Sequence, residues 1–181
     1  MPLSGGNDEG LLLLPPLPGH ILDVFSRTAF CYLATVEEVT GSPSTAVAHY
    51  SPHLCLMRFV WVSDPLHEGG GSLVLSTRRD SRKFFALQRN PHVAVLVHDD
   101  SALLSVTVYG DAEVCDGDEA ERLRALHLAR NPEYAQFISD RQRIAVVRIR
   151  VRTCRTADVN DRVHDIGPNA PSVRAAADTA V

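Results

Sequence analysis

The sequence predicts a mainly β protein of the α+β class, an antiparallel barrel of six or seven strands with peripheral helices. Seven segments are rich in β-branched and aromatic residues, against three or four helical patterns. The strands do not alternate with helices of the length that a parallel βαβ unit needs. Short connections at Gly41–Pro43 and Ser51–Pro52 favour antiparallel neighbours, and closing such a sheet into a barrel removes its edges.

One domain is expected over residues 19–167, between an N-terminal tail (1–18) and a C-terminal tail (168–181). The chain has 181 residues, of which 45% are hydrophobic and 22% charged, which is typical of a globular domain with a core of its own. Both tails carry Gly, Pro or Ala without a sustained hydrophobic period, so we expect them to be flexible.

The strand segments are separated by turn residues. Gly41–Pro43 and Ser51–Pro52 interrupt the second quarter of the chain, and a loop with three glycines spans residues 64–72. Gly110 lies inside a long strand pattern and predicts a bulge or a close backbone approach. The expected strands are residues 30–36, 44–50, 53–63, 73–77, 93–98, 103–115 and 143–157.

Helices are expected at four places. Residues 20–27 carry apolar side chains on one helical face, and residues 132–139 favour a short helix. A helix capped by Asp80 or Ser81 should end at Asn90–Pro91. Residues 116–130 give the best helical pattern. Its expected apolar face is Ala120, Leu123, Leu126 and Ala129.

Charge and cysteine content exclude several classes of protein. The net charge of −4 argues against a nucleic-acid backbone as the main partner. The longest apolar run, Leu11–Leu14, is too short to span a membrane, and its acidic, proline-bounded surroundings do not fit a secretory signal. The four cysteines lack paired metal-ligand spacing, so we expect reduced thiols in a cytoplasmic protein.

A basic cluster is the strongest local signal for a ligand. Four of the six residues from Arg78 to Lys83 are basic, where a strand gives way to a helix, and Lys83 is the only lysine in the chain. Cations disfavour a helix N-terminus, whereas a phosphate there would meet free amides, hydroxyls and Arg or Lys side chains. The alternative is a solvated turn in which the arginines pair with acids such as Asp80.

Several motifs resemble the FMN-binding split-barrel proteins related to pyridoxamine 5′-phosphate oxidase, including an uncharacterised branch of that family. The order and spacing match over roughly residues 21–157. The most specific part is Thr77 followed by Ser81–Lys83 and a helix that ends at Asn90–Pro91. The other matching pieces are Leu33–Val36, Gly41–Pro43, Pro52–Met57, Leu75–Thr77, Leu87, Val93 and Gly110–Glu113.

The resemblance implies FMN as cofactor, a split barrel and a homodimer with the flavin at its interface. By position, Ser81, Arg82 and Lys83 would hold the FMN phosphate, and Ser76 and Thr77 would border it. The strand that carries Leu56, Met57, Arg58 and Phe59 would lie along the flavin ring, with its backbone amides near the atoms that gain charge on reduction.

The implied activity is that of an FMN-dependent oxidoreductase acting on a small molecule. The oxidase has a basic ring-side residue where this chain has Cys55, and Arg58 is the nearest substitute. Its C-terminal Trp-and-Arg substrate segment is missing, since Trp61 is the only tryptophan. Pyridoxamine phosphate oxidation is therefore not the expected reaction. A non-catalytic flavin or haem binder is the alternative, and a deazaflavin could replace FMN.

Three other groups of residues have side chains able to carry chemistry. His49, His53 and Cys55 could approach a metal, but Pro52 interrupts their strand, and no metal site is predicted. A solvated loop is expected at His98–Asp100. The arginines at 148, 150 and 152 predict a solvated or edge-protecting strand face, or a positive wall beside an anion.

Overall fold

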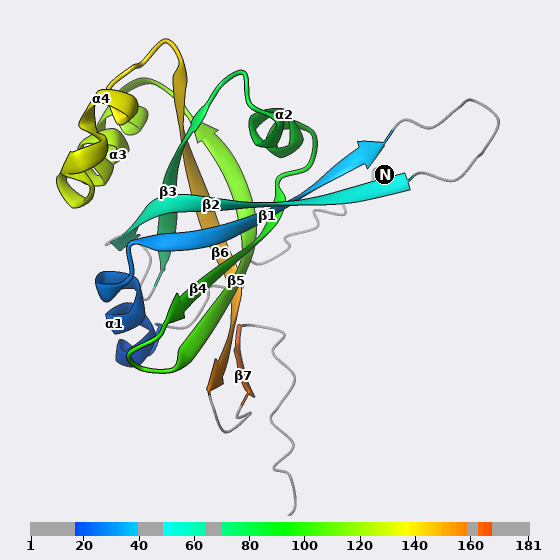
Figure 1. The fold of residues 1–181 in the computed structure, drawn as a ribbon, viewed down its shortest axis with the longest axis vertical. Coiled ribbons are helices and arrows are strands. Elements are labelled where there is room, and N and C mark those ends of the chain that lie inside the picture. Colours follow the sequence, from blue (N-terminus) through cyan, green and yellow to red (C-terminus); the bar gives the residue numbers. More distant parts are fainter. Residues whose placement is uncertain (1–16, 40–48, 64–69, 159–162, 168–181) are drawn as a thin grey trace, which may run out of the picture.

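The computed structural model describes residues 17–39, 49–63, 70–158 and 163–167. Its strands form one antiparallel sheet in the order β3-β2-β1-β4-β5-β6-β7, and β3 also pairs with β6, which closes the first six strands into a barrel (Figure 1). The predicted antiparallel α+β fold is confirmed. The strands are β1 (Phe30–Val39), β2 (His49–Ser63), β3 (Gly71–Arg78), β4 (His92–Asp99), β5 (Leu104–Cys115), β6 (Ile144–Asp158) and β7 (Val163–Ile166).

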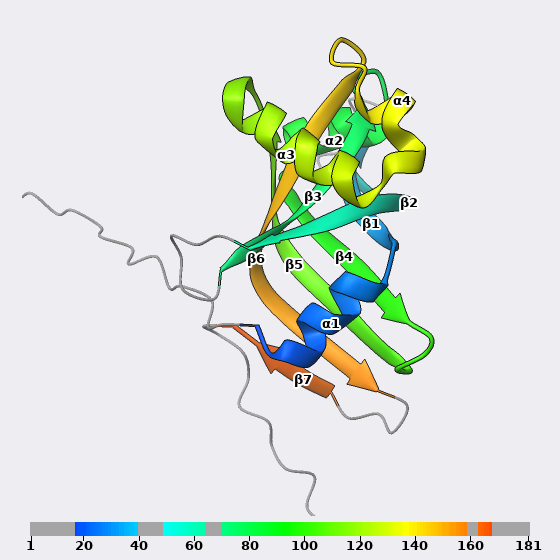
Figure 2. The ribbon, with the colours of Figure 1, turned by 90° about the vertical axis from the view of Figure 1, so that its left-hand side faces the viewer.

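The helices surround the barrel (Figure 2). Helix α1 (Gly19–Arg27) lies against β2, β4 and β5, and α2 (Arg82–Arg89) lies against β1, β3 and β5. Helix α3 (Gly117–Arg130) packs outside β2, β3 and β6. A 3₁₀ turn (Pro132–Tyr134) and the short α4 (Ala135–Ile138) follow it, and we call Pro132–Ile138 the α4 segment. All four predicted helical regions are therefore present.

The core lies inside the barrel and under α1. Strand residues alternate in burial, so that Leu33, Phe59 and Ile149 point inward. Helix α1 adds Ile21 and Phe25 to the same cluster, and the Phe25 ring meets the Phe59 ring edge-on at 6.1 Å between centroids. Each such side chain stabilises the fold by roughly 1.5–3 kcal/mol through burial, which makes the barrel a firm frame.

The predicted break at Ser51–Pro52 is wrong. One strand, β2, runs without interruption from His49 to Ser63, and Pro52 lies opposite Val36 of β1. Strand β3 pairs with β2 only over residues 59–63, so a proline at position 52 costs no hydrogen bond to β3. Residues 44–48 of the expected separate strand lie outside the described residues.

Two further features of the sheet are a short seventh strand and a bulge at Gly110. Strand β7 was not predicted, because Val163–Ile166 is too short to show a period. The bulge at Gly110 is confirmed: the β5–β6 register shifts between Tyr109 and Gly110. A Cβ atom at Gly110 would lie 2.2 Å from the carbonyl oxygen of Arg150, so glycine is required by close approach.

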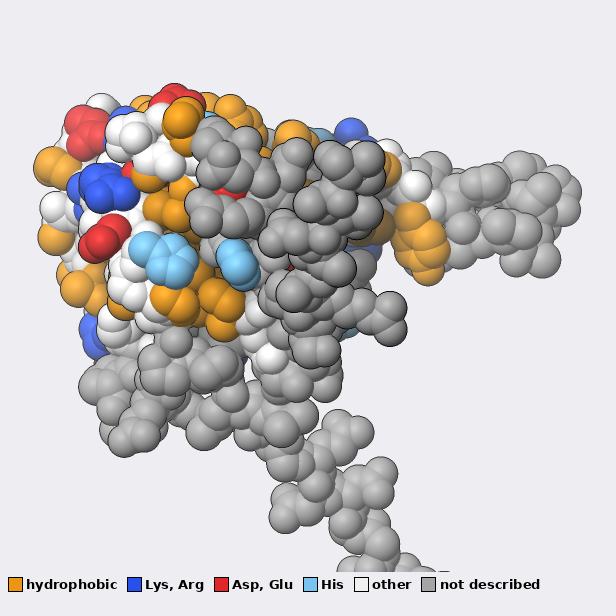
Figure 3. Space-filling model, turned by 90° about the horizontal axis from the view of Figure 1, so that it is seen from below, with side chains coloured by type: hydrophobic (Ala, Val, Ile, Leu, Met, Phe, Trp, Pro, Cys, Tyr) orange, Lys and Arg blue, Asp and Glu red, His pale blue; other side chains and the backbone are white. Residues whose placement is uncertain are grey.

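The remaining expectations concern membranes, metals, cysteines and surface charge. No helix in the described residues is long and apolar enough to cross a membrane. Those residues also contain no group of three His, Cys, Asp or Glu placed to hold a metal, and all four cysteines are free thiols. The face in Figure 3 carries hydrophobic and histidine side chains, and its visible basic ones are scattered rather than gathered in a stripe. The expected tails fall almost wholly outside the described residues.

Candidate functional site

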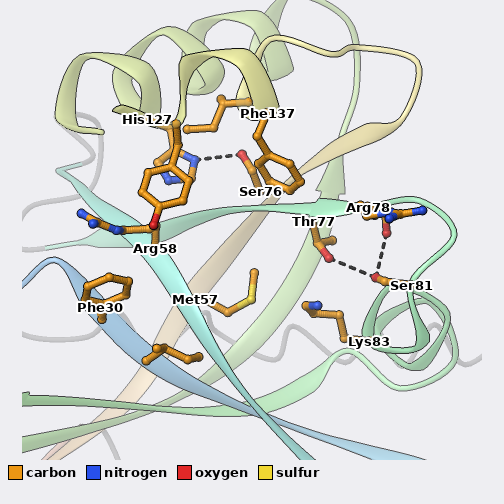
Figure 4. A pocket seen from close by; sticks show the side chains of 13 residues that line it. Phe30, Met57, Arg58, Ser76, Thr77, Arg78, Ser81, Lys83, His127 and Phe137 are labelled. Carbon is orange, nitrogen blue, oxygen red and sulfur yellow. Dashed lines mark hydrogen bonds between the residues drawn. The ribbon is translucent and has the colours of Figure 1, made fainter. Parts of the chain in front are cut away.

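A cavity of about 370 Å³ lies where the barrel splits. Strands β2 and β3 pair from Ser63↔Gly71 up to Phe59↔Leu75, and beyond that point β2 pairs with β1 while β3 pairs with β6. The two strands therefore separate at Arg58 and Ser76, and both line the cavity (Figure 4). The start of α2, the inner face of α3 and the α4 segment complete its walls.

The polar end of the cavity is formed by the turn from β3 into α2. Ser81 is the N-cap of α2: its hydroxyl oxygen accepts from the amide of Phe84 at 3.3 Å. The Ser81 hydroxyl donates to the carbonyl of Arg78 at 2.7 Å, so the Thr77 hydroxyl is the donor in the 3.1 Å contact between these side chains. Thr77 and Ser81 are thus ordered at the cavity wall before any ligand arrives.

The basic cluster divides between the cavity and the outer surface. Lys83 lines the cavity and forms no ion pair with any residue that the structure describes. Arg78 also borders the cavity, but it donates two hydrogen bonds of 2.8 and 2.6 Å to the Asp80 carboxylate. These bonds lower the pKa of that carboxyl. Arg82 does not line the cavity, because it pairs with Glu37 at 2.6 Å and is 59% exposed.

Strand β2 supplies the long wall. Leu56, Met57 and Arg58 line the cavity, whereas the Phe59 side chain is buried in the barrel core and does not. Near the polar end, burial raises the pKa of the Cys55 thiol, and the charge of Lys83 opposes that rise. Cys55 therefore lies close enough to Lys83 to feel its charge, yet it is not part of the cavity lining.

The opposite end of the cavity is aromatic. The guanidinium carbon of Arg58 lies 4.0 Å from the centre of the Phe30 ring and 4.7 Å from that of Tyr134. Arg58 also pairs with Glu133 at 2.7 Å. These contacts tie the α4 segment to β1 and β2, and Phe137 of the same segment lines the cavity beside them (Figure 4).

His127 of α3 is a cavity residue that the sequence analysis missed. Its side chain is 1% exposed, and Nδ1 lies 2.8 Å from the Ser76 hydroxyl. The Nε2 atom is buried without a hydrogen-bond partner. Burial, with a smaller effect of the charge on Arg124, lowers the pKa of His127 to about 4, so the imidazole is neutral at physiological pH.

His127 was missed because the predicted apolar face of α3 did not include it. A spacing of three falls short of the 3.6-residue turn, so the expected stripe drifts around the helix. The buried face is Ala120, Leu123, Arg124 and His127, while Leu126 is 38% exposed. Arg124 is buried because it donates to the carbonyls of Ile138 and Ile144. A count at i, i+3, i+4 and i+7 from Ala120 would have included His127.

The other candidate groups lie away from the cavity lining. Arg148 and Arg150 both pair with Glu113, and Arg152 pairs with Asp111. These arginines lie on β6, which pairs with β3, β5 and β7, so they form an ion-paired face rather than an edge guard or an anion site. In the predicted loop at 98–100, Asp99 is buried, and hydrogen bonds from Ser101 and Arg27 lower its pKa to about 2.

Sequence comparison settles the family. The family model of pyridoxamine 5′-phosphate oxidase matches residues 17–158. The chain belongs to this family. No curated protein sequence matches it. The fold is shared with the conserved hypothetical protein Rv2991 of Mycobacterium tuberculosis, at 25% identity and a TM-score of 0.56 over 80% of this chain and 86% of that one.

Two other solved structures are similar in fold. A heme binding protein of Mycobacterium smegmatis is 20% identical, with a TM-score of 0.59 over 82% of this chain and 58% of that one. A putative pyridoxamine 5′-phosphate oxidase of Listeria innocua is 21% identical, with a TM-score of 0.54 over 76% and 95% of the two chains. The predicted resemblance to this family is therefore confirmed, and with it the split-barrel fold.

Proposed function

We propose that the cavity binds FMN, with the phosphate at the polar end. The observation that carries this proposal is the position of Lys83, a cavity-lining ammonium group without a carboxylate partner in the described structure, at the first turn of α2. Thr77 and Ser81 add hydroxyls at this end, whereas the Ser76 hydroxyl is bonded to His127. The helix N-terminus adds a partial positive charge. Hydroxyls, amides and one free cation are the donors that a phosphate dianion needs.

The wall formed by β2 suits a flat ring. Leu56 and Met57 offer apolar side chains, and the edge of β2 beyond Phe59 has lost β3 as a hydrogen-bonding partner. Backbone groups on this edge are therefore free to bind the polar rim of a flavin. When bound, the flavin would supply two-electron redox chemistry between a small substrate and oxygen or a nicotinamide. The chain itself would bind, orient and shield the reacting molecules.

Arg82 stays a predicted phosphate ligand, but its side chain would first have to move toward the cavity. To reach the cavity it would have to leave Glu37, with which it forms an ion pair worth about 0.2–1 kcal/mol. Phe59 would contribute through its backbone alone, because its side chain fills the core. The proposed contact set therefore rests on Lys83, Ser81 and Thr77, with Arg82 in a secondary role.

We also propose that two chains form a homodimer through the outer face of β2, β1 and β4. Leu54 and Tyr32 are 64% and 44% exposed, and with Leu96 they border a shallow apolar hollow of about 280 Å³. Exposed apolar surface of this kind is typical of an interaction site. Leu56 belongs both to this face and to the cavity, so a second chain seated here would adjoin the proposed flavin site.

A non-catalytic binder is the second candidate. It is favoured by the M. smegmatis structure, which is named as a heme binding protein. Ligand release from the purified protein separates the candidates, since FMN, a deazaflavin and haem differ in mass and spectrum. With FMN bound, bleaching by NAD(P)H without oxygen supports an oxidoreductase. An unchanged spectrum with every donor tried supports a carrier or sensor.

A further inference from the structure

The α4 segment walls the aromatic end of the cavity and is anchored at both of its ends. Asn131, just before it, is 1% exposed, and its side-chain amide donates to the carbonyl of His127 at 3.2 Å. Ile138, its last residue, is also 1% exposed. Every residue between these two anchors is exposed, including Tyr134 and Phe137, which line the cavity. The middle of the segment therefore depends on side-chain contacts to stay in place.

One side chain of the barrel supplies those contacts. Arg58 of β2 pairs with Glu133 at 2.7 Å, and its guanidinium carbon lies 4.7 Å from the centre of the Tyr134 ring. Arg78 and Lys83, the other Arg and Lys side chains in the cavity lining, stand at the polar end (Figure 4). We call the Arg58–Glu133 pair the latch, because it ties the exposed middle of the α4 segment to the barrel.

The latch leaves the guanidinium of Arg58 incompletely bonded. Its Nη1 atom bonds to Glu133 and, at 3.5 Å, to Asn131, and its Nε atom is buried without a partner. The Nη2 atom is not buried in this way, and it has no hydrogen-bond partner among the described residues. A carboxylate can bond to two nitrogens of one guanidinium at once. A ligand carboxylate on Nη1 and Nη2 would therefore bind Arg58 through more hydrogen bonds than Glu133 does.

We propose that the α4 segment is a lid over the aromatic end, and that a ligand carboxylate releases it by taking the place of Glu133 on Arg58. Glu133 is 48% exposed, so its carboxylate returns to water at little cost. Until it leaves, its charge repels an incoming anion. The rings of Tyr134 and Phe137 favour a flat aromatic acid. The inference rests on the proposed function only in assigning the Lys83 end to the FMN phosphate.

Binding of two probes of one shape to the FMN-loaded protein tests the exchange by calorimetry at neutral pH. The probes are 2-naphthoate, which is anionic, and 2-naphthamide, which is uncharged. Glu133→Gln removes the competing charge and should tighten 2-naphthoate at least about fivefold, while 2-naphthamide changes less than about twofold. Asp118→Asn removes an equal charge from the exposed first turn of α3 and should change neither affinity.

A second background shows whether the gain depends on Arg58. In Arg58→Gln the anion has no guanidinium to bind, so adding Glu133→Gln should no longer tighten 2-naphthoate. If Arg58→Gln fails to fold, Glu133→Gln in the wild-type background and the exchange measurement below decide.

Hydrogen exchange of the backbone amides in residues 133–137 reports the lid itself. A ligand that only fills the cavity should slow this exchange or leave it unchanged. We expect 2-naphthoate to accelerate it severalfold, because the ligand releases the latch, and 2-naphthamide not to.

The outcomes separate the lid from the flavin. An unchanged 2-naphthoate affinity in Glu133→Gln, a gain that persists in Arg58→Gln, or slower exchange in the α4 segment with 2-naphthoate bound overturns the inference while FMN binding stands. A wild-type protein that does not bind FMN overturns the proposed function. The same titrations on the FMN-free protein then still decide the latch.

Discussion

Arg82 and Lys83 are neighbours in the sequence, yet their side chains point to different surroundings of α2. Lys83 lines the cavity, whereas Arg82 pairs with Glu37 at 2.6 Å on the outer surface. Successive helical residues are about 100° apart, so two adjacent side chains can point to different surfaces. In this basic cluster, Lys83 lines the cavity, Arg78 and Arg82 pair with carboxylates, and the guanidinium carbon of Arg79 lies 6.0 Å from the centre of the Phe84 ring.

Arg82→Ala should therefore have little effect on FMN. We expect the FMN dissociation constant to change by less than about threefold, because an exposed pair such as Arg82–Glu37 contributes only about 0.2–1 kcal/mol and faces away from the cavity. Fluorescence titration of FMN checks this. Glu37→Gln is the matched control, since it removes the same pair from the other side. An FMN loss above tenfold in Arg82→Ala would make Arg82 a main phosphate ligand rather than a secondary one.

Ser81→Ala should affect both stability and binding. The Ser81 hydroxyl caps α2 and contacts Thr77, so its removal should lower the free energy of unfolding by about 1 kcal/mol and also weaken FMN. Ser81→Thr keeps the hydroxyl and should retain most of both properties. Urea unfolding with and without FMN measures the two effects separately. Full stability of Ser81→Ala would contradict the capping role.

The low pKa of His127 predicts an acid-sensitive stability. The pKa falls from an ordinary 6.5 to about 4 in the folded protein, so the unfolded chain binds more protons between these values. The free energy of unfolding should therefore decrease as the pH falls from about 6.5 to 4, by up to about 3 kcal/mol from this residue. Urea unfolding at several pH values should show a flatter profile in His127→Phe than in the wild type.

Leu54→Glu should break the proposed dimer without unfolding the chain. The side chain is 64% exposed, so a charge there costs little in a single chain but is unfavourable inside an apolar interface. We expect a monomer by analytical ultracentrifugation and weaker FMN binding, because the partner adjoins the cavity. Leu126→Glu, on the exposed side of α3, should leave the assembly unchanged. A wild-type protein that is monomeric at high concentration would refute the dimer.

Local chemistry explains which features were predictable from the sequence. The cap at Ser81, the stop at Asn90–Pro91 and the bulge at Gly110 each depend on a residue with few conformational options, and all three were predicted. The strand through Pro52 was missed because its tolerance depends on where β3 ends, which is a property of the assembled sheet.

The candidate site was predictable only in part, for the same reason. Lys83 and Ser81 were found because they occupy a local strand-to-helix turn that also resembles a family motif. His127 was missed because it meets Ser76 across 51 positions of sequence, and nothing near it in the chain indicates that contact. The position of Arg82 depends equally on Glu37, which is 45 positions away.

The central claim is that Lys83 holds the phosphate of a bound flavin. It is tested most directly by comparing FMN with riboflavin, which lacks the phosphate, in the wild-type protein and in Lys83→Met. The wild type should bind FMN much more tightly than riboflavin, and Lys83→Met should lose about tenfold to a hundredfold in FMN affinity while riboflavin affinity is unchanged. Equal binding of the two flavins by the wild type, or an FMN affinity that survives Lys83→Met, would contradict the account.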